Sequence, residues 1–199
     1  ALNGAASHAF AHILYKGLLF MAMGAVLFRT GTIKANELGG LYKSMPLTCV
    51  FCIVGSLSIS GFPLFSGFVT KSMTMTAAFQ MDHTWLFVGL LIASAGVVDH
   101  SGIKIPFFAF FAHDSGKRVK EAPLNMLIAM GLAAAICIFN GSFPEAFLYK
   151  ILPSDVSYVP YTADHVLSQL QLLFFSALAL VWLGFSGREP AEIPCTNLD

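Results

Sequence analysis

Long apolar blocks separated by short polar stretches dominate this sequence of 199 residues. The blocks cover residues 8–28, 45–80, 85–112, 123–142 and 165–186. About twenty helical residues cross the hydrocarbon core of a bilayer, and the first, fourth and fifth blocks fit that length. The third block carries Gly102 and Pro106, which predict a kink or a tilt. The pattern therefore predicts an all-α polytopic membrane bundle of about five transmembrane helices.

The second block is too long for one regular span, so it is either two short spans or one broken helix. Read as a single pass, it places most basic residues on one side of the membrane, namely Arg29, Lys34, Lys43, Lys117, Arg118, Lys120 and Arg188. The other side then receives only Lys150, whereas two spans would divide the same residues evenly. Cytoplasmic loops carry an excess of Lys and Arg. We therefore predict one discontinuous helix with cytoplasmic basic loops, broken at Ser60, Gly61, Pro63 and Gly67.

Composition supports a membrane protein, since 56% of the residues are hydrophobic and only 11% are charged. Soluble domains carry about 25% charged residues. The formal net charge of zero argues against a nucleic-acid partner, and the lipid bilayer is the expected environment. No Met and no charged segment precede the first apolar block, so we expect Ala1 to lie inside a longer protein whose carboxyl-terminal part is this chain. Residues 188–199 are predicted to be a polar tail, and the aromatic and proline-rich stretch 143–153 a short interfacial helix.

The first apolar block opens with His8, His12 and Lys16, which helical spacing places on one face. A lysine in hydrocarbon costs roughly 2.5–3.5 kcal/mol on insertion scales, so it rarely sits there without a role or a partner. Lys16 lies near mid-span, from where snorkelling to the interface is strained. The three side chains predict a proton path, although ordinary helix packing is the alternative for both histidines.

Two further groups predict proton sites. Lys71 follows the predicted break, where unpaired carbonyls and amides lie beside its amine, as in the ion sites of transporters. Asp99, His100 and Lys104 lie near the middle of the third block, where they form either an exit relay or a set of mutual pairs.

The sequence predicts no metal, no cofactor and no catalytic site. Cys49 and Cys52 have the spacing of metal ligands, but they lie within an apolar block and lack a second cysteine pair. His8 and His12 could complete a zinc site only if the two helices touched, so two helix-packing residues are the preferred interpretation. A Gly-rich phosphate loop and a nucleophile elbow are both missing from the sequence.

Three motifs resemble one known family. Residues 12–24 resemble the HAxxKALLFLxxG pattern of the antiporter-like subunits of respiratory complex I and of Mrp-type cation/proton antiporters, with Gly17 in place of the usual Ala. Residues 39–46 are similar to the family's GGLxxxMP loop, and residues 60–71 to its SGxPxxxGFxSK broken helix, where Thr70 keeps the hydroxyl of the common Ser. The stretch 102–111 looks closer to the D-type Mrp subunits than to the complex I paralogues.

The resemblance implies a chain of proton sites that includes Lys16 and Lys71, with His8 and His12 as the histidines before the first lysine. Residues 1–187 would then be the carboxyl-terminal part of a proton-conducting domain in the cell (inner) membrane. Two functions stay open: proton transfer in a cation/proton antiporter, with Na⁺ as the exchanged ion, or a pump module of a redox enzyme such as an NADH:quinone oxidoreductase or a membrane-bound hydrogenase. Either one implies other membrane subunits as partners. A structural scaffold with paired lysines is the third alternative.

Overall fold

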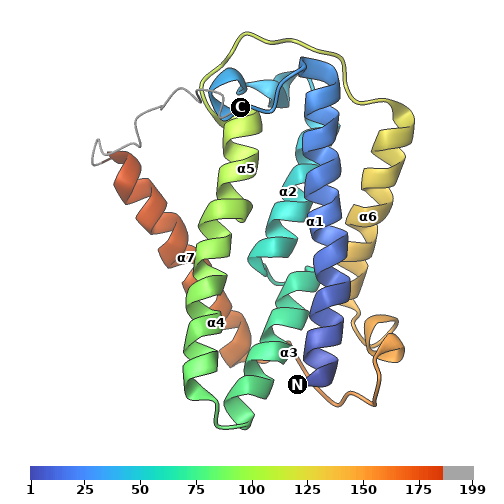
Figure 1. The fold of residues 1–199 in the computed structure, drawn as a ribbon, viewed down its shortest axis with the longest axis vertical. Helices are drawn as coiled ribbons and strands as arrows, with labels where there is room; N and C mark the ends of the chain where they lie inside the picture. The colour runs from blue at the N-terminus through green and yellow to red at the C-terminus, as the bar shows by residue number, and fades with distance from the viewer. Residues whose placement is uncertain (186–199) are drawn as a thin grey trace, which may run out of the picture.

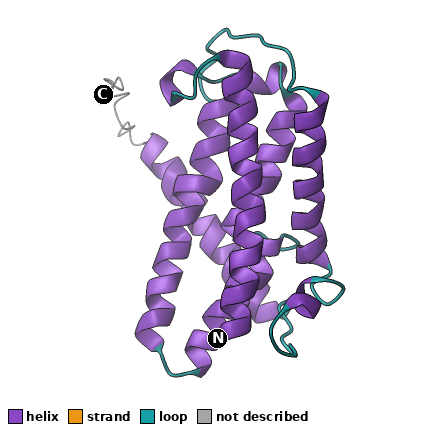
Figure 2. Cartoon of the chain, turned by 45° about the vertical axis from the view of Figure 1, so that its right-hand side comes forward, coloured by secondary structure: helices purple, strands orange, loops and turns teal. Residues whose placement is uncertain are grey.

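The computed structural model of the protein describes residues 1–185, and all regular structure in that part of the chain is helical (Figure 2). The long helices run along one common axis, from which α7 leans away (Figure 1). The α-helices are α1 (Leu2–Thr30), α2 (Pro46–Ser60), α3 (Ser66–Gln80), α4 (Thr84–Val97), α5 (Lys104–Pro106), α6 (Leu124–Ser142) and α7 (Ala163–Phe185). Short 3₁₀ turns lie at Ala35–Glu37, Leu41–Lys43 and Leu148–Ile151, and π-helical turns at Val98–Ile103 and Phe107–Phe111. The predicted all-α bundle is confirmed.

Three helical segments of the described chain are long and apolar enough to cross a membrane: Leu2–Thr30, Thr84–Phe111 and Leu124–Ser142. The segment Thr84–Phe111 runs from α4 through both π-helical turns, which flank Pro106. Proline lacks the N–H of a regular helical bond and its ring crowds the preceding turn, so the helix widens there. The irregularity expected from Gly102 and Pro106 therefore takes the form of π-helical turns.

α2 and α3 form a single broken pass antiparallel to α1. α3 packs on the N-terminal half of α1, where a Cβ added to Gly4 would lie 3.1 Å from Thr74. α2 packs on the C-terminal half, where a Cβ added to Gly55 would lie 3.0 Å from Leu19. Because consecutive half-helices cover consecutive halves of the same partner, the chain crosses the bundle once between them (Figure 1). The predicted discontinuous helix is confirmed.

The loops with most of the basic residues meet at one end of the bundle. Lys43 Nζ and Arg118 Nη2 lie 2.9 Å and 2.6 Å from Asp114 Oδ2. The Arg118 guanidinium, together with the Lys43 ammonium, holds the pKa of the Asp114 carboxyl well below its usual range. Arg29 Nε donates to the Glu121 carbonyl at 2.9 Å, which ties the end of α1 to the same loop.

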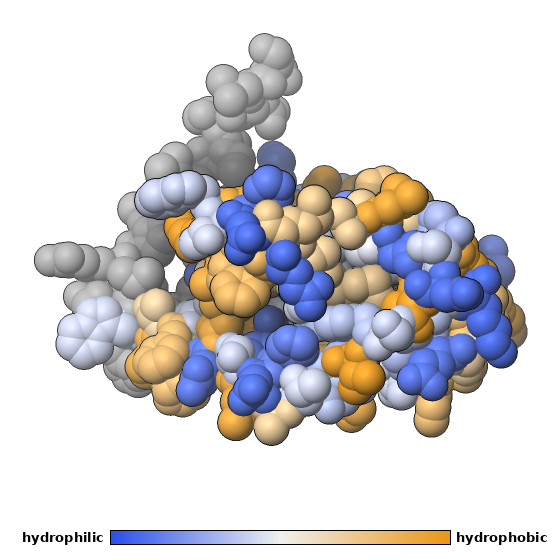
Figure 3. Space-filling model, turned by 90° about the horizontal axis from the view of Figure 1, so that it is seen from below, coloured by the Kyte–Doolittle hydropathy of each residue, from blue (hydrophilic) through white to orange (hydrophobic). Residues whose placement is uncertain are grey.

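The opposite end carries the N-terminus and Lys150. Lys150 lies in the turn Leu148–Ile151, which takes the place of the predicted interfacial helix, and Asn3 Nδ2 donates to the nearby Ser154 carbonyl at 3.0 Å. Viewed from this end, the molecule presents many polar side chains (Figure 3). The helix sides instead expose apolar side chains, including Phe20 (81%). Arg188 and the predicted polar tail lie outside the described residues.

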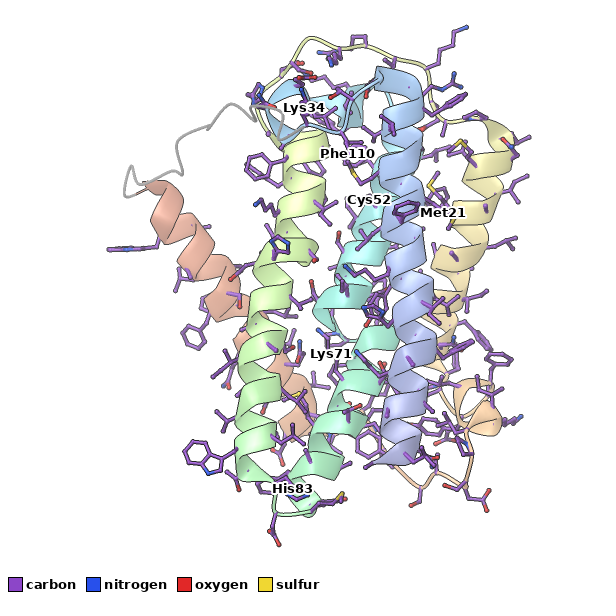
Figure 4. All side chains as sticks on the ribbon, in the orientation of Figure 1. Met21, Lys34, Cys52, Lys71, His83 and Phe110 are labelled. Atoms are coloured by element: carbon purple, nitrogen blue, oxygen red, sulfur yellow. The ribbon has the colours of Figure 1, made fainter. Side chains whose placement is uncertain are left out.

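Two apolar clusters hold the bundle together. The larger one joins α1, α2 and α6, with Tyr15, Leu18 and Met130 fully buried. The smaller one packs Phe68 and Val69 of α3, with other buried side chains, beneath the turn that carries Lys150. The break between α2 and α3 lies at mid-height in the bundle (Figure 4).

Candidate proton-transfer site at the helix break

The C-terminus of α2 ends in a Schellman motif. Gly61 adopts the left-handed conformation with φ 76°, which a glycine reaches without a Cβ clash. The Gly61 N–H donates to the Ser58 carbonyl at 3.1 Å, and the Phe62 N–H donates to the Leu57 carbonyl at 3.0 Å. A helix leaves its last four carbonyls without partners inside the helix. The motif satisfies two of these, so the carbonyls of Ile59 and Ser60 need other donors.

Side chains from two other helices supply those donors. Lys71 Nζ, on α3, donates to the Ile59 carbonyl at 2.6 Å, and Gln169 Nε2, on α7, donates to the Ser60 carbonyl at 3.0 Å. Lys71 Nζ also lies 3.4 Å from Ser94 Oγ on α4. The C-terminus of a helix carries a partial negative charge that favours a nearby cation. The broken helix therefore creates an ammonium site inside the bundle, and Figure 4 places Lys71 at its level.

Close backbone contacts hold the start of α3 against this site. A Cβ on Gly67 would overlap the Ser58 carbonyl oxygen, and one on Gly141 of α6 would overlap the Leu64 carbonyl oxygen. The predicted break residues thus have distinct places: Ser60 ends α2, Gly61 follows it, Pro63 lies in the connection, and Gly67 lies in the first turn of α3.

A cavity of about 170 Å³ adjoins Lys71. Besides Lys71, its polar lining comes from His8, Thr74 and Ser94, and α4 adds apolar side chains to the lining. His8 Nδ1 lies 3.1 Å from Thr70 Oγ1, which orients the imidazole from the neighbouring turn of α3. The structure thus brings His8 of α1 and Lys71 of α3 to one cavity, which is larger than the roughly 30 Å³ share of one water molecule.

His12 and Lys16 continue along α1 away from this cavity. The ring centroid of His12 lies 6.0 Å from that of His8 and 5.3 Å from that of Tyr15. Both His12 and Lys16 are exposed in the middle of their helix, and neither lines the Lys71 cavity. The four-residue spacing places them on a continuous face, but Lys16 belongs to the outer surface of the described chain.

The structure separates Asp99 from His100 and Lys104. His100 and Lys104 lie on an exposed face of the π-helical segment, whereas Asp99 is half-buried. Within residues 1–185, the Asp99 Oδ1 atom is buried without a hydrogen-bond partner. No hydrogen bond or ion pair joins the three side chains in that range, so proton transfer among them stays a prediction.

Cys49 and Cys52 are buried free thiols on α2, packed in the larger apolar cluster. They lie opposite the C-terminal half of α1, whereas His8 and His12 lie on its N-terminal half. No group of three or more His, Cys, Asp or Glu side chains in residues 1–185 is arranged to hold a metal ion.

Three contacts of the site were not predicted from the sequence: Thr70 as the partner of His8, Ser94 as a partner of Lys71, and Gln169 at the break. A contact of Gln169 inside the bundle could have been predicted from the sequence, because an amide in an apolar block of membrane length needs a hydrogen-bond partner. The contact of Ser94 could not have been predicted, because small hydroxyl residues are frequent wherever membrane helices pack closely.

Comparison with known protein families matches residues 1–96 to the family described as NADH:quinone oxidoreductase/Mrp antiporter, transmembrane. The match covers just under half of the chain. The matched range runs from α1 into α4 and includes the break, Lys16 and Lys71. The resemblance drawn from the three sequence motifs is confirmed.

Individual relatives are similar over most of the chain. The A-type subunit of the Na⁺/H⁺ antiporter from Alkalihalophilus pseudofirmus is 32% identical over 94% of this chain and 24% of that protein. The corresponding A-type subunit from Bacillus subtilis is 31% identical over 82% of this chain and 22% of that protein. The chain therefore spans about a quarter of the length of these curated relatives. Both relatives are A-type subunits, and the closer likeness to D-type subunits stays a prediction.

Among solved structures, the chain is similar to one in the membrane-bound sulfane sulfur reductase, an archaeal respiratory membrane complex. The TM-score is 0.71 at 26% identity, over 98% of this chain and 34% of that one. The described fold therefore recurs in a chain of a respiratory membrane complex.

Proposed function

We propose that this chain carries protons across a membrane as part of a cation/proton antiporter, with Na⁺ as the exchanged cation. The proposed path runs through His8, His12, Lys16 and Lys71, with Asp99, His100 and Lys104 as a further relay. The observation that carries the proposal is the placement of Lys71. Its ammonium is held by the Ile59 carbonyl at the break and faces a cavity shared with His8.

Each part of this arrangement has a role in proton transfer. The carbonyl end of α2 stabilises the charged amine, and the cavity has room for water that can pass the proton on. His8 adds an imidazole, the side chain whose ordinary titration range lies closest to neutral pH. Protonation of Lys71 also changes the charge close to His8 and His12, which couples successive steps electrostatically.

A redox-driven proton pump is the second candidate, supported by the likeness to a chain of an archaeal respiratory complex. The neighbouring reading frames distinguish the two functions. A redox module requires partners with iron–sulfur clusters or a quinone site, whereas an antiporter requires only further membrane subunits. In either case we propose that the chain works beside other membrane subunits in the cell membrane.

Replacing Lys71 tests the proposal. Lys71→Ala and Lys71→Arg should both reduce Na⁺-driven proton movement in vesicles holding the assembled complex by at least about a hundredfold, the usual contribution of a positioned proton-transfer group. The arginine variant is the sharper one, because guanidinium keeps the charge but does not release its proton. A pH-sensitive dye reports the transport.

The matched control is Lys34→Ala, at an exposed lysine in the loop after α1, which should transport normally. Wild-type transport by Lys71→Ala at normal protein levels would contradict a lysine relay. Full activity of Lys71→Arg would show that the site needs only a fixed positive charge.

A further inference from the structure

α7 turns a glutamine toward the bundle at membrane depth. Its outward side exposes apolar residues such as Leu167 (58%) and Phe174 (61%), as expected of a lipid-facing helix. Gln169 lies on the opposite, half-buried side, which also carries the buried Ser176. An amide in this position is costly unless it is hydrogen-bonded. Its partner, the Ser60 carbonyl, lies directly beside the carbonyl that holds Lys71.

Gln169 and Lys71 approach the break from two sides of Gly61. A Cβ added to Gly61 would lie 3.2 Å from Gln169 Nε2 and 3.3 Å from Lys71 Cδ. The two side chains therefore divide the last two carbonyls of α2 between them. Lys71 has three N–H donors and could bind a second carbonyl if one were open to it. Gln169 satisfies the carbonyl of the next residue, Ser60.

We propose that Gln169 is a positioning residue for proton transfer: by donating to the Ser60 carbonyl it satisfies that carbonyl without the Lys71 ammonium, which stays on the Ile59 carbonyl. This inference rests on the proposed role of Lys71. An ammonium held by two carbonyls at the negative end of a helix is bound more tightly than one held by a single carbonyl. Gln169 thus keeps the protonated lysine loosely enough bound to release its proton in each transport cycle.

The groups that face Lys71 allow a clear test. α1 contributes the titratable side chains His8 and His12, which are close enough to interact with Lys71 electrostatically. α4 contributes Ser94 and α7 contributes Gln169, and both are uncharged. Substitution of Gln169 by an uncharged residue therefore changes the hydrogen bonding at the break and leaves these charges unchanged.

The test compares Gln169→Met with Gln171→Met in vesicles that hold the assembled complex. Methionine keeps the length of glutamine but cannot donate to Ser60. Gln171 is a matched control, because it lies on the same helix, is exposed and makes no hydrogen bond in the described chain. In Gln169→Met, transport at neutral pH should fall roughly tenfold, and the pH of half-maximal transport should rise by about one unit. The shift is upward because a more tightly held ammonium gives up its proton only at higher pH.

Gln169→Glu provides a second variant of nearly the same shape. Its carboxylate cannot donate to Ser60 and attracts the Lys71 ammonium, so it should lower neutral-pH transport further than Gln169→Met does. An unshifted pH profile in both Gln169 variants, with Lys71→Ala inactive, would overturn this inference alone. Loss of the assembled complex in both variants would make Gln169 a structural residue and would overturn it as well. Wild-type transport by Lys71→Ala would instead remove the proposed function itself.

Discussion

At the scale of single residues, each carbonyl that the end of α2 leaves without a partner in its own helix has a hydrogen-bond donor at the break. The last four carbonyls of α2 are satisfied by two backbone amides and two side chains, of Lys71 and Gln169. An unsatisfied carbonyl inside a bilayer costs several kcal/mol, so a helix can stop there only where such donors exist. The lysine that we propose as the proton carrier is also one of the groups that make the break possible.

Gly67→Ala should destabilise the protein by about 1–3 kcal/mol, the usual range for overpacking a buried site. The added methyl would overlap the Ser58 carbonyl oxygen, which is fixed by the Schellman motif and cannot move freely. Thermal unfolding of the complex in detergent measures the effect. Gly24→Ala is the control, because a Cβ there meets nothing within 4 Å and alanine favours helix. Equal unfolding temperatures for both variants would contradict this account of the break.

The sequence predicted some residues of the site and missed others. Lys71 and the break residues could be predicted because a charge and a Gly–Pro interruption stand out in an apolar block. The donor to the Ser60 carbonyl could not be assigned, because Gln169 lies more than a hundred residues away and reaches the break only through the packing of α7. Asp99, His100 and Lys104 lie close in sequence, but helix geometry turns Asp99 to a different side.

At the scale of elements, the loops that carry most of the basic residues hold the ends of the helices in place. Glu121 accepts a hydrogen bond from the Leu47 N–H at 2.8 Å and from Thr48 Oγ1 at 2.6 Å, so the loop before α6 caps the first turn of α2. A carboxylate at a helix N-terminus also complements the positive end of the helix dipole. Asp114 joins the same loop to the loop before α2 through Lys43. The α2 half of the broken helix is therefore held from its far end as well.

Asp114→Asn should loosen the loop at residues 112–123 and raise its backbone hydrogen-exchange rate at neutral pH. Because the pKa of Asp114 is depressed in the folded protein, its stabilising contribution is complete above the unfolded value of about 3.9. That contribution is lost as the pH falls through the lower folded pKa. The difference between variant and wild type should therefore vanish in acid, and it should shrink in high salt.

Asp155→Asn, an exposed aspartate at the opposite end, is the matched control and should leave exchange in residues 112–123 unchanged. If Asp114→Asn raised the exchange rate by the same amount in strong acid, the loop could not be held by the ion pairs of Asp114.

At the scale of the whole molecule, the direction of each pass follows from the break. One broken pass between α1 and α4 places the loops before α2 and α6 at the same end, and the turn with Lys150 at the other (Figure 1). The described chain also leaves His12 and Lys16 exposed on α1, while its sides expose large apolar residues. A charged face at mid-span is costly against lipid, which agrees with a chain that works beside other membrane segments.

Single cysteines at the positions of Lys117 and Lys150, in a background without native cysteines, should react with a membrane-impermeant thiol reagent from opposite sides. The Lys117 position should be labelled in inside-out vesicles and the Lys150 position in right-side-out cells, because positive loops stay in the cytoplasm. Labelling of both positions from one side would mean that the α2–α3 unit crosses the membrane twice.

The sequence by itself determined the class of protein, the apolar blocks, the place of the break and the lysine beside it. Each of these depends on local chemistry: an apolar residue partitions into lipid, a glycine accepts a positive φ, and an amine in hydrocarbon needs a reason to be there. Only the tertiary structure decided which side chains complete the site. Thr70 orients His8, Ser94 and the Ile59 carbonyl hold Lys71, and Gln169 takes the remaining carbonyl. Most of these partners come from other helices, and helix packing, which no local pattern encodes, brings them within hydrogen-bonding distance.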